Sequence, residues 1–182
     1  DVFVISKVWN DAHAPADAVA SVRRSLADLR LDHLDALLIH WPFPNTHARF
    51  AAPDARNPDS RPYIHAEYMA MYHALEDLVD AGLVRHLGVS NMTIPKLRLV
   101  LRDARIVPAI NEMELHPAFQ QGELYQASLD AGMVVIGYSP MGSPRRPERD
   151  RFDGDVADLD HPVIVRIAAE LGVHPAEVCL KW

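Results

Sequence analysis

The chain has 182 residues, of which 49% are hydrophobic and 24% charged, and its formal net charge is -7. This composition is ordinary for a globular protein and excludes a disordered chain. The negative charge disfavours nucleic acid and membrane surfaces as partners, because both favour a basic face. We therefore expect one globular domain with a sizeable core.

The only cysteine, Cys179, cannot form an intrachain disulfide, and in "AEVCLKW" it has the setting of a small core residue. A reducing, cytoplasmic compartment is therefore expected. No run of about 18 apolar residues is present to cross a membrane. The chain opens at Asp1 inside a strand-like run and stops at Trp182 in mid-pattern, so we expect a piece of a longer protein.

Short apolar runs alternate with segments of helical period along the whole chain. The runs are typical of strands covered on both faces: "DVFVISKVW", "LDALLIHWP", "VRHLGVSN", "VPAINEMELHP" and "MVVIGYSPMG". The helical segments carry these apolar faces: Ala18, Val22, Leu26 and Leu29; Met71, Leu75, Leu78 and Val79; Ile94, Leu97, Val100 and Leu101. "GELYQASLDAG" predicts a further helix, and "HPVIVRIAAELG" with "HPAEVCLKW" a last one in one or two pieces.

Strand and helix in alternation predict a parallel sheet with crossover helices. The chain lacks both the G-x-G-x-x-G turn of dinucleotide-binding sheets and a P-loop. Polar or aromatic residues stand instead at the carboxyl end of each strand: Lys7 and Trp9, His40 and Trp41, Ser90 and Asn91, Glu112 and Glu114, Tyr138 and Ser139. In a (β/α)8 barrel those ends converge on one face. The predicted fold is therefore α/β, a partial (β/α)8 TIM barrel with about five of its eight βα units.

Residues 43–66, between the second strand and its helix, hold four prolines and no regular pattern. A connection of this length is either a functional lid or a disordered insertion. Because it leaves the strand directly after His40 and Trp41, we favour a lid over the site.

The strand ends also resemble the aldo-keto reductase family, in family order: "SKVW", "DALLIHWP", "GLVRHLGVSN", "PAINEMELHP" and "GYSPMGSP". The resemblance implies one partial barrel domain over residues 1–182, from the third strand to the seventh helix of the family pattern. It implies reversible hydride transfer between NADP(H) and a carbonyl, with NAD(H) not excluded. The family's catalytic tyrosine, and the aspartate that pairs with its lysine, belong to a segment N-terminal to this chain.

Two residues are implied as catalytic. Lys7 would stabilise the phenolate of that tyrosine, and His40 would donate a hydrogen bond to the substrate carbonyl. Trp9 and Trp41 would wall an apolar substrate pocket. The alternatives are a surface lysine, a core histidine and plain core packing of the two tryptophans.

A second set is implied to bind the cofactor. Ser90 and Asn91 would fix the nicotinamide carboxamide, although either could cap the next helix unless Thr93 does so. Tyr138 would stack on the nicotinamide ring. Behind it the backbone of "SPMGSP" would face the pyrophosphate, with hydroxyls from two serines and a methionine in place of the usual leucine: Ser139, Ser143 and Met141.

Glu112 departs from the family, which usually has glutamine at this position. An ionised carboxylate only accepts hydrogen bonds, so Glu112 could take the carboxamide NH2 group but could not donate to its oxygen. We expect the substitution of Glu112 by glutamine to change cofactor affinity.

Three readings stay open: a carbonyl reductase, a non-catalytic cofactor-binding relative, and an unrelated barrel hydrolase that uses Glu112 and Glu114. Lys7 and His40 favour the enzyme, because cofactor binding alone needs neither. No metal is expected, since the histidines show no ligand spacing, and His116 is assigned to a turn. We expect a monomer acting on a small carbonyl or alcohol. The isolated chain should be inactive and poorly stable, with open edges on its outer strands.

Overall fold

The computed structural model of the chain describes residues 2–44, 60–142 and 157–182. Its strands follow the predicted runs: β1 Ile5–Val8, β2 Leu34–Ile39, β3 Val84–Ser90, β4 Ile110–Glu114 and β5 Val134–Tyr138. Its helices lie between and after them: α1 Pro15–Leu29, α2 His65–Asp80, α3 Ile94–Asp103, α4 Gly122–Asp130, α5 Pro162–Leu171 and α6 Pro175–Lys181, with a 3-10 turn η2 at Asp158–Asp160. The predicted alternation of strands and helices is confirmed.

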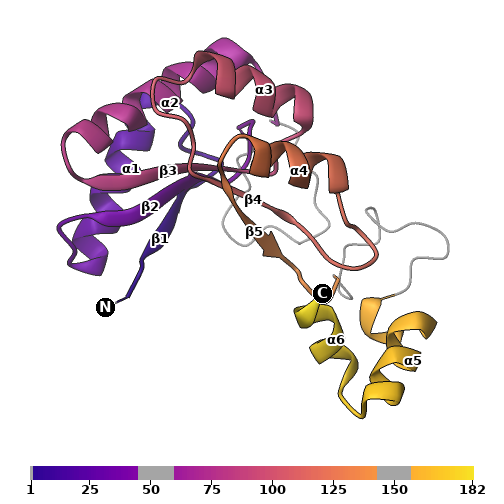
Figure 1. Cartoon of the computed structure of the whole chain (residues 1–182). Coiled ribbons are helices and arrows are strands. Elements are labelled where there is room, and N and C mark those ends of the chain that lie inside the picture. Colours follow the sequence, from indigo (N-terminus) through magenta and orange to yellow (C-terminus); the bar gives the residue numbers. More distant parts are fainter. Residues whose placement is uncertain (1, 45–59, 143–156) are drawn as a thin grey trace.

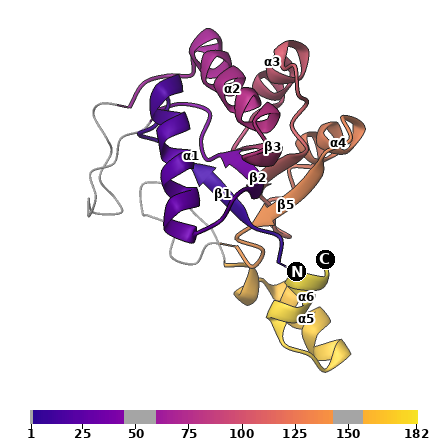
Figure 2. The same ribbon diagram turned by 90° about the vertical axis from the view of Figure 1, so that its left-hand side faces the viewer.

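The strands form one parallel sheet in the order β1-β2-β3-β4-β5. Each outer strand, β1 and β5, pairs with one neighbour only among the described residues, as expected of an unclosed barrel. Helices α1 to α4 lie along one side of the sheet, and α5 and α6 lie apart, beyond the end of β5 (Figures 1 and 2).

Alternate residues of the central strand β2 face opposite sides of the sheet. Leu37 and Ile39 belong to the large core that includes buried side chains of the covering helices. Leu38 and Ala36 face the other way and pack with Ile110 in a second, smaller cluster. The sheet is therefore apolar on both faces, which explains the unbroken apolar runs in the sequence.

A glycine in β3 is required by the close approach of its neighbours on this second face. A Cβ at Gly88 would lie 2.9 Å from Leu38 Cγ and 3.0 Å from the Ile110 carbonyl oxygen. Only a residue without a side chain lets β2 and β4 fill the space in front of β3.

The helix boundaries follow the sequence closely. Gly82, just past the α2 cap, has φ +74° as its predicted C′ role requires. The last predicted helix is in two pieces, α5 and α6, and Cys179 on α6 is buried at 3% exposure. One expected core position is wrong: Leu29 is 51% exposed, because α1 ends there and Arg30 turns left-handed at φ 55°.

Most of the predicted lid, residues 45–59, lies outside the described residues. Helix α2 already begins at His65, so the irregular segment ends earlier than predicted. At its two ends, the rings of Phe43 and Tyr63 lie beside Lys96, whose Nζ is 5.6 and 5.4 Å from their centroids. The role of a lid stays a prediction.

None of the helices in the described ranges is long and apolar enough to cross a membrane.

Candidate functional site

The strand register stacks the predicted site residues in layers on the face opposite the helices. Lys7 is opposite Leu38, which is opposite Gly88, which is opposite Ile110. Because side chains repeat every two residues, the next layer toward the carboxyl ends holds these residues: Trp9, His40, Ser90, Glu112 and Ile136. One layer further, Glu114 is opposite Tyr138. The predicted convergence of strand ends is a property of this register.

The ammonium of Lys7 and the carboxylate of Glu112 form an ion pair, with 2.7 Å between Nζ and Oε1. Strands β1 and β4 are separated by two strands in the sheet, so the sheet curves enough for their tips to meet. The sequence predicted a carboxamide contact for Glu112 and did not predict Lys7 as its partner. The available signal was two opposite charges at the ends of two strands of one barrel.

His40 is held between aromatic rings at the end of β2. The ring of Trp9 stacks on it at a centroid distance of 4.5 Å, and Trp41 meets its edge at 6.3 Å. Burial lowers the pKa of the imidazole below its ordinary value, the Lys7 ammonium lowers it further, and the Glu112 carboxylate opposes both. The ring is therefore neutral near pH 7 and has one N–H to donate. Its buried Nδ1 has no hydrogen-bond partner within the described ranges.

Asn91 joins three strand ends through its amide. The Tyr138 hydroxyl donates to Asn91 Oδ1 at 2.6 Å, and Asn91 Nδ2 donates to the His40 carbonyl at 2.8 Å and to Ser90 Oγ at 3.1 Å. A left-handed backbone at φ 56° aims the side chain back across the sheet. Both amide hydrogens are thus used inside the protein, and only Oδ1 keeps accepting capacity for a ligand.

The serine side chain next to Asn91 lies outside the N-cap position of α3, which is Thr93, although the Thr93 side chain makes no capping hydrogen bond. Ser90 is 1% exposed, and its Oγ accepts from Asn91, which leaves its hydroxyl hydrogen to donate elsewhere.

A tight turn follows β5 at the same end of the sheet. Ser139 is left-handed at φ 51°, and the Gly142 N–H donates to the Ser139 carbonyl at 2.9 Å. Met141 lies within this turn, half-buried. The remaining predicted phosphate contact, Ser143, lies outside the described residues.

A second polar cluster, which the sequence analysis missed, lies at the end of β4. His116 Nδ1 is 3.0 Å from Asp158 Oδ2, and its Nε2 is 3.4 Å from Glu114 Oε1. The backbone of His116 exchanges hydrogen bonds with that of Phe119, which is the turn role expected of it. The cluster fastens η2 to the sheet and so anchors the segment that leads into α5.

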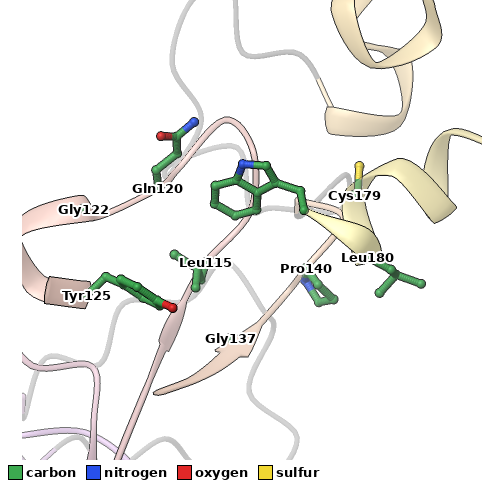
Figure 3. A pocket seen from close by; sticks show the side chains of 9 residues that line it. Leu115, Gln120, Gly122, Tyr125, Gly137, Pro140, Cys179 and Leu180 are labelled. Atoms are coloured by element: carbon green, nitrogen blue, oxygen red, sulfur yellow. The ribbon is translucent and has the colours of Figure 1, made fainter. Parts of the chain in front are cut away.

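A cavity of about 470 Å³ lies elsewhere, between α4, the outer strand β5 and α6 (Figure 3). Leu115, Tyr125, Pro140 and Cys179 are among its lining residues, and none of the predicted site residues lines it. It lies beside the outer strand, so it does not mark the candidate site. Within the described ranges no group of three His, Cys, Asp or Glu side chains is placed to hold a metal ion.

Comparisons with known proteins agree with this arrangement. Residues 1–182 match the Aldo/keto reductase family. Over the whole chain, an aldo/keto reductase of Synechocystis is 39% identical and human aldo-keto reductase family 1 member A1 is 37% identical. The chain spans 55% of the length of each of these two relatives.

Solved structures of the family superpose on most of the chain. An aldose reductase from Giardia lamblia has a TM-score of 0.78 at 31% identity and covers 100% of this chain, which spans 57% of that structure. An aldo-keto reductase complexed with NADPH has a TM-score of 0.78 at 28% identity and covers 98% of this chain, which spans 51% of that structure. The five-stranded sheet is therefore part of a (β/α)8 barrel, as predicted. The chain belongs to the aldo/keto reductase family.

Proposed function

We propose that the protein containing this chain is an NADPH-dependent oxidoreductase that reduces aldehydes or ketones to alcohols reversibly, with NADH as the alternative cofactor. The observation that carries the proposal is the convergence of Lys7, His40, Asn91 and Tyr138 on one side of the sheet. A similar structure, described above, is an aldo-keto reductase complexed with NADPH, which supports this choice of cofactor.

The residues present fit a nicotinamide cofactor. The Ser90 hydroxyl has a hydrogen to donate, Asn91 Oδ1 can accept a second one, and the Tyr138 hydroxyl lies 2.6 Å from that Oδ1. The turn after β5, with Ser139 and Met141, would face the pyrophosphate, as would Ser143, which lies outside the described residues. The bound cofactor would supply or accept the hydride. These residues would orient it toward the substrate.

His40 and Lys7 carry the chemistry in this proposal. A neutral imidazole donates its N–H to the substrate carbonyl and offsets the charge that develops on oxygen. The Lys7 ammonium stabilises the deprotonated form of a general acid supplied from outside this chain. Trp9 and Trp41, which flank His40, would wall the apolar part of the substrate site.

The other two readings are weaker. A barrel hydrolase would need Glu112 and Glu114 as an acid and a base, yet Glu112 forms an ion pair with Lys7, and Glu114 Oε1 lies 3.4 Å from His116 Nε2. A non-catalytic relative would have no use for a partly buried ion pair and an imidazole placed between two indole rings.

The test uses this chain joined to the remaining strands of the barrel. NADPH consumption is followed by absorbance with a panel of aldehydes and ketones. Lys7→Met and His40→Ala should each lower kcat by about 10²–10⁴-fold. Lys181→Met, which changes an exposed residue of α6, serves as the control and should stay within about twofold. A non-catalytic protein would bind NADPH without turnover, and a hydrolase would not bind it.

We further propose that the protein is a monomer. We also propose a reducing, cytoplasmic compartment, because Cys179 is buried and free. Elution as a dimer in size-exclusion chromatography would contradict the monomer. The isolated chain is predicted to show no turnover, because β1 and β5 each have one open edge in the part of the chain that the structure describes.

A further inference from the structure

The ion pair between Lys7 and Glu112 is the longest-range polar contact in the described part of the site. The two residues are 105 positions apart, and their charged atoms lie 2.7 Å from each other. This distance is that of a charge-assisted hydrogen bond, which is shorter and stronger than one between neutral groups. The contact links the first strand of the sheet to the fourth.

The setting of this pair differs from that of surface ion pairs in the same chain. The side chains of Lys7 and Glu112 are 31% and 12% exposed, whereas those of Arg61 and Glu67 are 56% and 50% exposed at a distance of 3.3 Å. Partial burial reduces screening by water, which strengthens the attraction between the two charges.

The same two charges act on His40. The ammonium of Lys7 and the carboxylate of Glu112 shift the pKa of the imidazole in opposite directions, so all three groups share one region. Glu112 lies level with His40 in the register, one layer beyond Lys7. The Glu112 carboxylate is thus placed to attract the Lys7 ammonium toward the carboxyl ends of the strands, where the barrel opens.

We propose that Glu112 is a positioning residue that holds Lys7 at the mouth of the barrel and acts on the reaction through that lysine. This inference rests on the proposed function. It departs from the expectation that Glu112 contacts the nicotinamide carboxamide, because its Oε1 is engaged by an ammonium and Oε2 alone is left to accept from the carboxamide NH2 group. A glutamine at this position, which is the family's usual residue, cannot form an ion pair, so the proposal concerns what the charge of Glu112 adds in this chain.

The first test measures the pairing itself and needs no turnover. In the protein with a complete barrel, brief acetylation with acetic anhydride followed by peptide mass spectrometry resolves the three lysines of this chain, Lys7, Lys96 and Lys181. Glu112→Gln should raise the acetylation rate of Lys7 about fivefold, because the amino group loses its hydrogen-bonded partner. The rate at Lys181 serves as the internal reference, and Glu67→Gln removes a remote carboxylate as the matched control. An unchanged rate at Lys7 would overturn the pairing.

The second test is a double-mutant cycle on kcat in the protein with a complete barrel. Glu112→Gln should lower kcat about tenfold when Lys7 is present and less than about twofold in a Lys7→Met background. Glu112→Asp keeps the charge and should restore much of the loss. Equal losses in both backgrounds would show that Glu112 acts independently of Lys7. Thermal melts of each variant identify any loss that comes from unfolding.

The third measurement separates the two candidate roles of Glu112 by NADPH affinity. A positioning residue leaves the Kd within about threefold on Glu112→Gln, whereas a carboxamide contact would raise it about tenfold or more. The latter result would reject the positioning role. If the unsubstituted protein shows no carbonyl reduction, the proposed function fails, and acetylation and NADPH binding still decide whether Glu112 holds Lys7.

Discussion

The centre of the sheet and its β5 end differ sharply in burial. Every residue of β2 is buried, whereas no residue of β5 is, and Val134 at its start is 62% exposed. Strand β2 has a neighbour on each side and lies under the helices, but among the described residues β5 pairs with β4 alone. Apolar composition is alike in the two strands, so the number of neighbours sets the burial.

The candidate site joins these two regions. The Lys7–Glu112 pair ties β1 to β4, and the hydrogen bond from Tyr138 to Asn91 ties β5 to β3. Polar contacts at the strand ends thus hold the poorly covered strand against the well-packed ones. The difference in burial predicts four graded effects.

The largest effect is expected from truncating a central leucine. Leu37 is 1% exposed in the large core, so Leu37→Ala should destabilise the chain by about 2–5 kcal/mol, enough to unfold a marginal domain. Val134→Ala on β5 is the matched change and should alter stability by less than about 0.5 kcal/mol. Urea unfolding followed by circular dichroism measures both, and equal losses would contradict the comparison.

Adding a methyl group tests the packing of the two strands from the other direction. Gly88→Ala places a Cβ too close to Leu38 Cγ, at 2.9 Å, and to the Ile110 carbonyl oxygen, at 3.0 Å. The substitution should lower the free energy of unfolding by about 1–3 kcal/mol. In Gly137→Ala on β5, the new Cβ would lie 3.2 Å from Leu115 Cβ, a looser contact than the 2.9 and 3.0 Å at Gly88. Thermal unfolding should therefore show a smaller loss for Gly137→Ala, and the reverse order would refute this account.

The well-packed part of the molecule also contains a partly buried titratable group, His13, on the segment that connects β1 to α1. Burial, followed by the charge of Arg61, lowers its pKa from 6.5 to about 4. His13 therefore binds a proton more readily in the unfolded chain than in the folded one. The stability that comes from keeping this imidazole neutral is fully present above pH 6.5 and is lost as the pH falls toward 4. The loss should be about 1–2 kcal/mol after allowance for solvent access.

The control for this pH effect is His13→Gln, which should remove the loss between pH 6.5 and 4 while leaving the acid unfolding of the carboxylates. Unfolding free energies in urea at several pH values give the comparison. Parallel curves for the two proteins would exclude His13 as the source.

The smallest effect on stability is expected from the hydrogen bond that links Tyr138 at the end of β5 to Asn91 after β3. Tyr138→Phe removes the hydroxyl that donates to Asn91 and should destabilise by about 0.5–1.5 kcal/mol. Tyr125→Phe on α4 removes a hydroxyl from a residue that is 38% exposed, so it is the matched control and should have less effect. A greater loss from Tyr125→Phe would show that the Tyr138 bond does not fasten β5.

The site was predicted to different depths at different residues. The positions of Lys7, His40 and Tyr138 at converging strand ends followed from the alternation of strands and helices, because parallel strands present their carboxyl ends to one edge. The partners of Glu112 and Asn91 did not follow. Both depend on which side chains meet across a curved sheet, and the sequence pattern contains no measure of curvature.

The sequence by itself determined the order of the elements, the parallel sheet and the polar strand ends, because apolar periodicity and turn residues act over a few neighbours along the chain. Only the tertiary structure decided that Glu112 meets Lys7, that His116 lies between two carboxylates and that β5 is exposed. These features join residues far apart in the chain, and their geometry depends on strand register and sheet curvature. Register and curvature are set by the packing of the whole sheet, which no local pattern specifies.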